Sequence, residues 1–282
     1  MQLDAHLLGG AGDPAVFVRW VAPEAPRAGV VFLHGSMVHS EYYLPLAVGL
    51  AERGFCCWLP DLSGHGRSDG ERGHLRAVDQ HVTDVLRVVE AEVPAHAPWI
   101  LGGESYGAVV AALAFHHLPS HRRPGGLVLV SPAVRLRVSM APWARGLVRA
   151  AAELWPRLRP PIPAGLRGVT AHPDIEELVR RDPLLCRRYS LGFFAALLEA
   201  QDRLAQLEPP AAPTLMLVPE SDVVVDHEET LRLATRWPDC RAEVLAGGLH
   251  ALCVDRSREV AERIAGWFLA APKDFRPQCS PA

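Results

Sequence analysis

The chain has 282 residues, of which 49% are hydrophobic and 22% are charged, and its net charge is -3 at neutral pH. A chain of this length and composition can bury a sizeable core, so we expect one large α/β domain with an insertion rather than two independent domains. The basic residues form no long block, which excludes nucleic acid as a partner.

The cysteine pattern indicates a reducing compartment. No Cys-x-x-Cys spacing occurs among the cysteines, so we expect buried thiols rather than a disulfide or zinc framework. The chain opens without a basic segment followed by an apolar core, and no run of about 18 uninterrupted apolar residues is present. We therefore expect a cytoplasmic protein. The cysteines are Cys56, Cys57, Cys186, Cys240, Cys253 and Cys279.

The first half of the chain alternates predicted strands and helices. Two strands, 3–8 and 15–21, flank a glycine-rich turn and predict an antiparallel start. The next strands are expected at 30–33, 55–59, 99–101 and 127–130, with helices at 42–53, at 78–93 and after residue 105. Because these strands are continuously apolar and alternate with helices, they predict a mostly parallel sheet covered on both faces.

Residues 134–208 interrupt this alternation. No strand is predicted there, several prolines occur, and two helical stretches carry apolar stripes, one with Trp143 and one with Phe193 and Leu197. We interpret this segment as a helical cap, or lid, inserted after the sixth strand. The alternative is that its apolar faces only pack on the core.

The sheet then resumes, with strands expected at 214–218 and 242–245 and helices at 227–236 and 256–269. The two parts of the predicted α/β core are therefore 1–133 and 209–271. Residues 272–282 are rich in proline and polar residues, and we expect a flexible tail.

A Gly-x-Ser-x-Gly pentapeptide, 103–107, lies between an apolar strand and an alanine- and valine-rich segment. A strand, a sharp turn and a helix in this order hold the serine in a strained backbone conformation, with glycines where a Cβ would collide. Ser105 is therefore the candidate nucleophile. The same pattern at 66–70 lies in a polar loop, so we interpret Ser68 as structural.

A serine hydroxyl needs an imidazole to accept its proton and a carboxylate to orient that imidazole. In a parallel sheet such groups lie in loops at the carboxyl ends of strands. Asp222 and His250 each follow a predicted strand, and the order Ser105, Asp222, His250 predicts a catalytic triad. Asp226 is instead predicted to cap the next helix, with Glu229 as its capping-box partner.

Acyl transfer also needs two donors for the developing oxyanion. The backbone N–H of Tyr106 is one candidate, and the N–H of Ser36, in the loop that follows the strand at 30–33, is the other. The nearby histidines have spacings that fit no common ligand motif, so we expect neither a metal nor a cofactor. These histidines are His34, His39, His65 and His74.

Several of these motifs together resemble an α/β hydrolase of the monoacylglycerol lipase and lysophospholipase branch, which is also grouped with serine aminopeptidase-like hydrolases. The resemblance runs from about residue 30 to 268. It rests on His34-Gly35-Ser36 with His39-Ser40 and Tyr43, on Asp61 with Gly64-His65-Gly66, Ser68, Gly70 and Arg72-Gly73, and on Asp182-Pro183-Leu184. The resemblance implies the α/β-hydrolase fold, the same triad and the same oxyanion donors.

Three residues depart from the family pattern. Glu104 and Tyr106 flank the nucleophile where many relatives have His and Met, and Pro219 replaces the glycine that usually lies three residues before the acid. The cap is the segment that transfers least between relatives. The shape of the acyl pocket is therefore expected to differ from that of other members.

We expect a serine hydrolase that cleaves carboxylic esters of the monoacylglycerol or lysophospholipid type through an acyl-enzyme, with transient contact between the cap and a membrane surface. The alternatives are a thioesterase, an aryl esterase or an aminopeptidase that uses the same triad, or a ligand-binding protein with little turnover. The candidate pocket residues are His34, Met37, Glu104, Trp143, Phe193 and Leu197.

Overall fold

The computed structural model describes residues 1–9, 14–138, 140–161 and 168–270. The tail predicted at 272–282 lies outside the described residues. The strands are β1 (Gln2–Leu8), β2 (Val16–Ala22), β3 (Ala28–Leu33), β4 (Phe55–Pro60), β5 (Trp99–Glu104), β6 (Leu127–Val130), β7 (Thr214–Pro219) and β8 (Cys240–Leu245). The helices are α1 (Leu44–Ala51), α2 (Asp79–Glu92), α3 (Tyr106–His117), α4 (Pro142–Leu154), α5 (Pro173–Arg181), α6 (Leu191–Gln206), α7 (His227–Arg236), α8 (Leu252–Asp255) and α9 (Ser257–Ala270), with short 3₁₀ turns at Ser40–Tyr43 and Ser120–Arg122.

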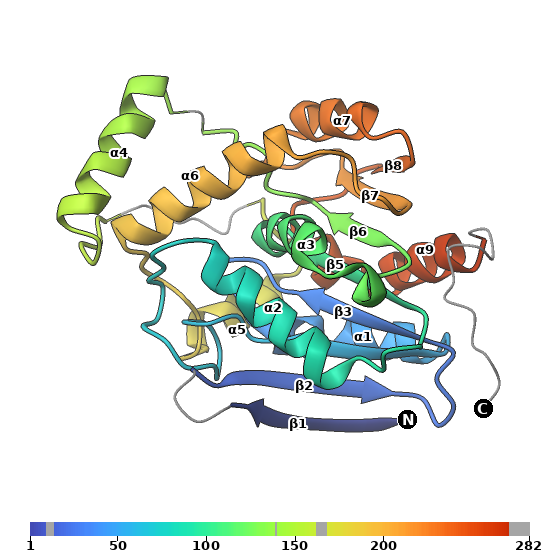
Figure 1. The fold of residues 1–282 in the computed structure, drawn as a ribbon. Coiled ribbons are helices and arrows are strands. Elements are labelled where there is room, and N and C mark those ends of the chain that lie inside the picture. Colours follow the sequence, from blue (N-terminus) through green and yellow to red (C-terminus); the bar gives the residue numbers. More distant parts are fainter. Residues whose placement is uncertain (10–13, 139, 162–167, 271–282) are drawn as a thin grey trace.

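These strands form one sheet in the order β1-β2-β4-β3-β5-β6-β7-β8 (Figure 1). β1 pairs antiparallel with β2, and β2 antiparallel with β4, whereas the pairs from β4 to β8 are parallel. Parallel strands need crossover connections, which α1 to α3 supply in the first half of the chain. The α/β-hydrolase fold class and the antiparallel start are therefore as predicted.

Helices cover both faces of the sheet and create two cores. One core joins the sheet to α2, α3, α6 and α7, and the other joins it to α1, α8 and α9 (Figure 1). Helix α3 is buried over every residue from Tyr106 to Phe115, because β5, β6, α2 and α6 surround it. Burying a Val or Leu side chain contributes roughly 1.5 to 3 kcal/mol, so this central helix stabilises the fold strongly.

Most predicted element bounds agree with the structure to within a few residues. The helix expected at 42–53 begins as a 3₁₀ turn before α1, and Gly54 ends it with a φ of +90°, as a C-terminal glycine does. The helix expected at 256–269 is preceded by the short α8, which the sequence did not predict.

Between β6 and β7 the chain carries α4, α5 and α6. Helix α6 packs on α3, and α4 packs in turn on α6, at the edge of the molecule (Figure 1). The Arg145 and Arg149 guanidinium groups of α4 both pair with Asp202 of α6. Because these arginines face α6, the apolar face of α4 is turned outward, where Trp143 is 72% and Leu147 is 60% exposed. The division of the chain into core and cap stays a prediction.

The described cysteines are free thiols. Cys56, Cys57, Cys186 and Cys253 are buried, Cys240 is half-buried, and Cys279 lies outside the described residues. Burial raises the pKa of the Cys56 and Cys186 thiols to about 11, which disfavours the reactive thiolate. Within the part of the chain that the structure describes, no helix is long and apolar enough to span a lipid bilayer.

Candidate active site

Ser105 lies in the sharp turn between β5 and α3, with φ 56° and ψ −118°. A positive φ is rare for a residue with a side chain and marks a strained position that the surroundings enforce. A Cβ on Gly103 would lie 2.5 Å from the carbonyl carbon of Gly107, and a Cβ on Gly107 would lie 2.4 Å from the carbonyl oxygen of His34. Both glycines are therefore required for the close approach of helix and sheet at this turn.

Ser105, His250 and Asp222 form a chain of hydrogen bonds. The His250 Nε2 atom lies 2.9 Å from Ser105 Oγ, and the His250 Nδ1 atom lies 2.7 Å from Asp222 Oδ2. A carboxylate can only accept, so the ring proton is assigned to Nδ1, which leaves Nε2 to accept from the serine hydroxyl. This is the arrangement that proton transfer from a serine requires.

Asp222 follows β7, and its carboxylate also receives two backbone donors. Its Oδ1 atom accepts from the N–H of Val224 at 2.7 Å and of Val225 at 2.9 Å. Burial by itself would raise the pKa of Asp222, but the hydrogen bond and charge of His250 and these two N–H groups outweigh burial and hold the pKa below its usual value. The carboxylate therefore stays ionised beside the imidazole.

Asp226, the alternative to Asp222 as the acid, has a structural role. The Asp226 carboxylate caps α7 by accepting from the N–H groups of Glu228 and Glu229, as predicted. The Glu229 carboxylate pairs with Arg232, at 2.7 Å, and with Arg135 rather than completing the expected capping box. Asp226 is thus the N-cap residue of α7, as predicted. The expectation that Glu229 is its capping-box partner was wrong, because Arg232 and Arg135 bind the Glu229 carboxylate.

The Ser68 hydroxyl joins the loop after β4 to strand β2. It donates to the carbonyl of Asp61 and accepts from the N–H of Phe17 at 2.8 Å. Asp61, which is fully buried, accepts from the N–H of Ser40 at 2.7 Å and of Arg67 at 2.9 Å. Ser68 therefore belongs to a structural network, and the second serine pentapeptide is a loop, as the sequence indicated.

The loop after β3 lies against the nucleophile. A Cβ on Gly35 would lie 3.6 Å from the Cβ of Ser105, at ordinary van der Waals distance, so this loop is in direct contact with the nucleophile. The Gly35 N–H donates to the Tyr43 hydroxyl at 3.0 Å. The next residue is Ser36, and its N–H, together with that of Tyr106, stays the predicted pair of oxyanion donors.

His34, a candidate pocket residue, is held by backbone groups on both sides of its ring. Its Nε2 atom accepts from the N–H of Leu62 at 2.9 Å, so Nδ1 carries the proton and donates to the Gly35 carbonyl at 2.7 Å. Burial lowers the pKa of His34 to about 4, so the ring is neutral at neutral pH. His34 therefore connects the loop after β3 to the loop after β4 by hydrogen bonds.

The structure brings other pocket candidates together beside Tyr106. The Phe193 ring on α6 lies 5.5 Å from the Tyr106 ring and 4.2 Å from the Tyr189 ring, measured between centroids. Leu197 belongs to the same buried cluster. Trp143, in contrast, is exposed on α4 and stands apart from this cluster.

The segment before α6 contacts the loop after β3. The Tyr189 hydroxyl donates to the Ser36 carbonyl, and the Cys186 N–H donates to the Met37 carbonyl at 3.1 Å. Met37, the last candidate pocket residue, is half-buried and packs against the core on the α1 side. The segment before α6 and the predicted oxyanion loop are thus hydrogen-bonded to each other.

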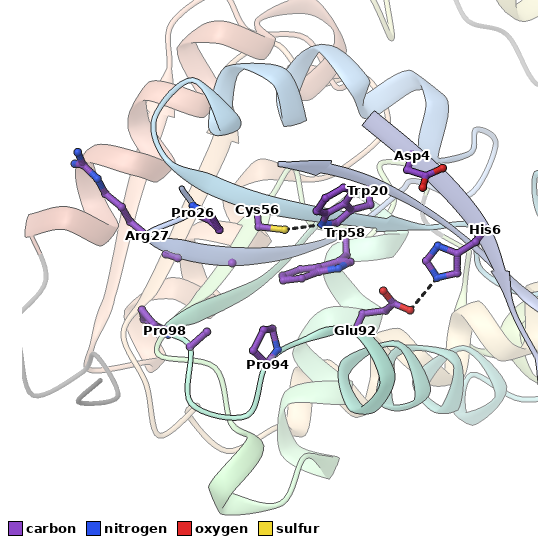
Figure 2. Close-up of a pocket in the computed structure, with 13 residues that line it drawn as sticks. Asp4, His6, Trp20, Pro26, Arg27, Cys56, Trp58, Glu92, Pro94 and Pro98 are labelled. Carbon is purple, nitrogen blue, oxygen red and sulfur yellow. Dashed lines mark hydrogen bonds and ion pairs between the residues drawn. The ribbon is translucent and has the colours of Figure 1, made fainter. Parts of the chain in front are cut away.

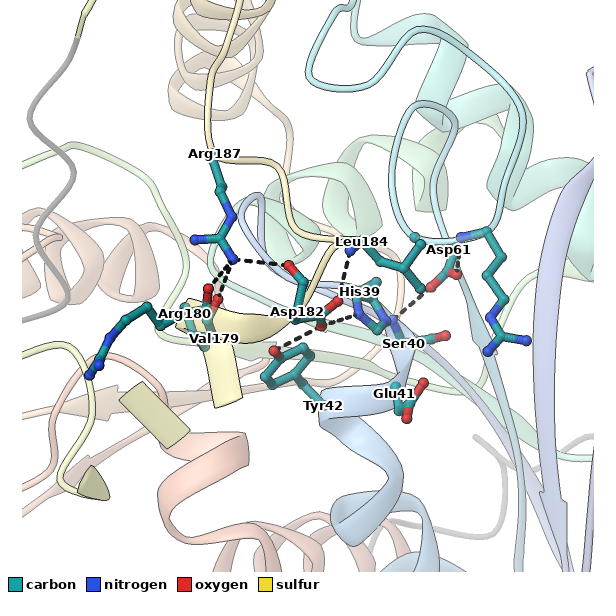
Figure 3. Close-up of polar contacts among 12 residues, drawn as sticks. His39, Ser40, Glu41, Tyr42, Asp61, Val179, Arg180, Asp182, Leu184 and Arg187 are labelled. Atoms are coloured by element: carbon teal, nitrogen blue, oxygen red, sulfur yellow. Dashed lines mark hydrogen bonds and ion pairs between the residues drawn. The ribbon is translucent and has the colours of Figure 1, made fainter. Parts of the chain in front are cut away.

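The Asp182 carboxylate is a second link between these segments (Figure 3). Its Oδ2 atom contacts His39 Nε2 at 2.8 Å and accepts from the Tyr42 hydroxyl at 3.0 Å, while Oδ1 accepts from the N–H of Leu184 at 2.7 Å. Burial would raise the pKa of Asp182, but these donors outweigh burial and lower the pKa. The Asp-Pro-Leu motif therefore holds the segment after α5 against the residues just before α1.

A separate cavity of about 540 Å³ has a lining that does not include Ser105 (Figure 2). Its lining includes Trp20 and Trp58, together with Gly29 at the start of β3 and Pro98 just before β5. These are the amino-terminal ends of the parallel strands, whereas the nucleophile follows the carboxyl end of β5. The cavity is therefore not the place where an ester would meet Ser105.

Within the described ranges, no group of three or more His, Cys, Asp or Glu side chains is arranged to hold a metal ion. Sequence reasoning missed three side-chain roles that structure the site, those of His81, Tyr189 and Glu104. The His81 ring accepts from the Tyr106 hydroxyl at 2.9 Å, Tyr189 contacts the Ser36 carbonyl, and Glu104 receives donors from Tyr43 and from the Cys253 backbone. Glu104 and Tyr43 were named from the sequence, but not for these contacts, whereas His81 and Tyr189 carried no local signal.

Comparisons with known proteins identify the family of the chain. The sequence profile of the family "Serine aminopeptidase, S33" matches residues 24–257. The human monoglyceride lipase is 28% identical over 255 residues, which cover 88% of this chain and 83% of that protein. The monoacylglycerol lipase of Mycolicibacterium smegmatis is 26% identical over 279 residues, 94% of this chain and 96% of that protein.

One relative is much longer. An uncharacterized abhydrolase domain-containing protein of Dictyostelium discoideum is 24% identical over 203 residues, which are 72% of this chain but 22% of that protein. Among solved structures, the monoacylglycerol lipase of Paleococcus ferrophilus superposes with a TM-score of 0.78 at 24% identity, covering 96% of this chain and 99% of that one. At this identity the likeness shows the fold.

Proposed function

Since the chain belongs to the serine aminopeptidase S33 family of α/β hydrolases, we propose that it is a serine hydrolase that cleaves monoacylglycerol or lysophospholipid-type esters. The observation that carries this proposal is the hydrogen-bonded chain from Ser105 through His250 to Asp222. The full-length similarity to a bacterial monoacylglycerol lipase supports the substrate class.

In the proposed reaction the Ser105 oxygen attacks the ester carbonyl while His250 Nε2 takes its proton. Asp222 orients the ring and stabilises the imidazolium. The N–H groups of Ser36 and Tyr106 stabilise the oxyanion, and the collapse of the tetrahedral intermediate expels the alcohol, which takes its proton from His250. Water then hydrolyses the acyl-enzyme by the same steps, so no cofactor is required.

Part of the acyl chain would lie against the aromatic cluster around Phe193. This ring lies beside Tyr106, which directly follows the nucleophile. Apolar and aromatic side chains with few polar groups are the usual lining of a lipid site. The Tyr189 hydroxyl fixes the cluster to the Ser36 carbonyl, so acyl pocket and oxyanion loop would be built as one unit.

The substrate class can be tested directly. Purified protein is assayed with 1-monoacylglycerols, lysophosphatidylcholines, p-nitrophenyl esters and acyl thioesters of graded chain length, and Ser105 is mapped with a fluorophosphonate probe. We expect the highest kcat/KM on a glyceryl or lysophospholipid ester and a single adduct on Ser105. Preference for the thioesters would assign the same triad to another acyl substrate, and an adduct elsewhere would refute the mechanism.

The outward face of α4 suggests how a lipid would reach the site. Trp143, Leu147 and Leu154 are 72%, 60% and 69% exposed and lie on one face of this helix. An amphipathic helix with an unpaired apolar face is suited to lie at the interface of a membrane. Transient contact of α4 with a lipid surface is therefore part of the proposal, and a cytoplasmic location stays a prediction.

A further inference from the structure

The side chain of Glu104, the residue before Ser105, lies buried where two loops converge. Its Oε1 atom accepts from the N–H of Cys253 at 2.8 Å, and its Oε2 atom accepts from the hydroxyl of Tyr43 at 2.8 Å. Cys253 belongs to α8, three residues after His250. One carboxylate behind the nucleophile thus holds the helix that follows the imidazole.

Through Tyr43 the same carboxylate reaches the loop after β3. The Tyr43 hydroxyl donates to Glu104 and accepts from the N–H of Gly35 at 3.0 Å. The Gly35 N–H belongs to the peptide just before the one that carries the N–H of Ser36, and the carbonyl of that second peptide accepts from His34 Nδ1 at 2.7 Å, so the Tyr43 hydroxyl holds the start of the turn that presents the Ser36 N–H. Glu104 is therefore connected to both loops that must converge on Ser105.

The groups that face Glu104 favour its ionised form. The N–H of Cys253 and the hydroxyl of Tyr43 are both donors, and a carboxylate is an acceptor at both oxygens. Burial holds the pKa of Glu104 above its usual value, and the Cys253 N–H, the charge of His250 and the Tyr43 hydroxyl limit that rise. Glu104 directly precedes Ser105, whose Oγ contacts His250 Nε2, and its carboxylate binds the N–H of Cys253 three residues after His250, so its charge lies on the same side of the site as the imidazole.

We propose that Glu104 is a positioning residue. As a carboxylate it holds the loop after β3 in place through Tyr43, holds α8, which follows His250, through the Cys253 N–H, and stabilises the imidazolium of His250. The effect on rate rests on the proposed function, whereas the effect on the imidazole does not. This role differs from the pocket-lining role expected from the sequence, since both carboxylate oxygens are engaged with protein donors.

The test uses two substitutions of Glu104, with kcat and KM measured across pH on a soluble p-nitrophenyl ester. Glu104→Gln removes the charge and keeps the size. We expect kcat to fall about 10 to 100-fold with little change in KM, and the acid limb of the kcat/KM profile to move to lower pH by about 0.5 to 1 unit, because an opposite charge near the imidazole is lost. Glu104→Asp keeps the charge, so its acid limb should stay near that of the wild type.

Tyr43→Phe separates the two roles. It breaks the link to the Gly35 N–H but leaves the Glu104 carboxylate and its contact with Cys253. We expect kcat to fall about 10-fold while the acid limb stays in place. A Tyr43→Phe enzyme with wild-type kcat would overturn the proposed link to the oxyanion loop.

Asp84→Asn is the matched control. Asp84 on α2 is another buried carboxylate with two donors, the Ser63 N–H at 2.8 Å and the Ser63 hydroxyl at 2.9 Å. Its loss imposes a similar structural stress, so it should lower the melting temperature without moving the acid limb. An equal shift in Asp84→Asn and Glu104→Gln, or no shift in the latter, would overturn the electrostatic role of Glu104.

An NMR titration of the His250 imidazole needs no turnover. We expect its midpoint to be lower in Glu104→Gln than in the wild type and preserved in Glu104→Asp. If the wild type hydrolyses no ester and Ser105 takes no fluorophosphonate, the proposed function fails, and this titration still decides the inference. If Glu104→Gln does not fold, Glu104→Asp and Tyr43→Phe supply the comparison: a midpoint displaced in Glu104→Asp would refute the role of the charge.

Discussion

At the scale of single residues, the catalytic hypothesis depends on Ser105, which has a strained backbone and contacts His250 Nε2. Ser105→Ala removes the nucleophile and adds no new clash, so kcat on esters should fall by about 10⁵ to 10⁶ while the fold remains. The measurement is steady-state turnover together with a thermal melt and fluorophosphonate labelling. Labelling of Ser105→Ala equal to that of the wild type would show that another residue reacts, and Ser68→Ala serves as the comparison.

Asp222 and Asp226 both follow β7 and provide a matched pair of substitutions. Asp222→Asn removes the carboxylate that orients the His250 ring, so kcat at neutral pH should fall by about 10⁴. Asp226→Asn should change the rate little, because asparagine caps a helix nearly as well as aspartate. Both variants are compared for kcat across pH after circular dichroism has verified folding. A folded but inactive Asp226→Asn beside an active Asp222→Asn would reverse the assignment.

At the scale of elements, α4 combines an ion-paired face with an exposed apolar face. Arg145 and Arg149 hold it on α6 through Asp202, and Leu147 points away from the protein. Leu147→Glu should therefore leave hydrolysis of a soluble short-chain ester unchanged and lower the rate on monoacylglycerol in phospholipid vesicles about 5 to 10-fold, because burying a leucine at an interface contributes roughly 1.5 to 3 kcal/mol, part of which is lost.

The control for this prediction is Leu3→Glu on β1. Leu3 is exposed to a similar extent, 65% against 60% for Leu147, but it lies on the antiparallel edge of the sheet. Vesicle co-sedimentation and activity are measured for both variants. Equal losses in the two variants would mean that surface charge in general, rather than α4, controls activity on vesicles.

At the scale of the whole molecule, a group of buried histidines makes the fold sensitive to acid. His34, His65 and His81 are buried, and burial lowers the pKa of His34 and of His81 to about 4 and that of His65 well below its usual value. Between pH 6.5 and 4 these rings bind protons in the unfolded chain but not in the folded one. The free energy of unfolding should therefore fall as the pH falls through this window.

His81→Gln tests this prediction. The glutamine can still donate and accept, as His81 does toward the Ser63 carbonyl and the Tyr106 hydroxyl. The free energy of unfolding is measured in urea from pH 7 to pH 4. Over this range the variant should lose about 3 kcal/mol less than the wild type, because the wild type has a His81 pKa that folding lowers from 6.5 to about 4. The Asp84 carboxyl on the same helix acts in the opposite direction, because burial raises its pKa to about 6. His121→Gln, at an exposed site, should follow the wild-type curve, and a His81→Gln curve parallel to it would refute the prediction.

The local pattern of the sequence determined much of this molecule. The strand, turn and helix around Ser105 and the glycines at 103 and 107 are properties of neighbouring residues, and the structure shows the close contacts that they predict. Asp222 and His250 could be chosen because parallel strands end at one edge of a sheet, so residues far apart in the chain meet there. Their hydrogen bonds follow from that topology.

Only the tertiary structure decided which side chains face the site and which face away from it. An apolar stripe on a helix predicts that one face is apolar, but burial depends on distant segments that cover that face. Phe193 is covered by α3 and the loops beside it, whereas Trp143 is left outside because Arg145 and Arg149 turn the other face of α4 toward Asp202. Glu104 likewise could not be assigned from its neighbours, since its donors Tyr43 and Cys253 come from segments 61 and 149 residues away.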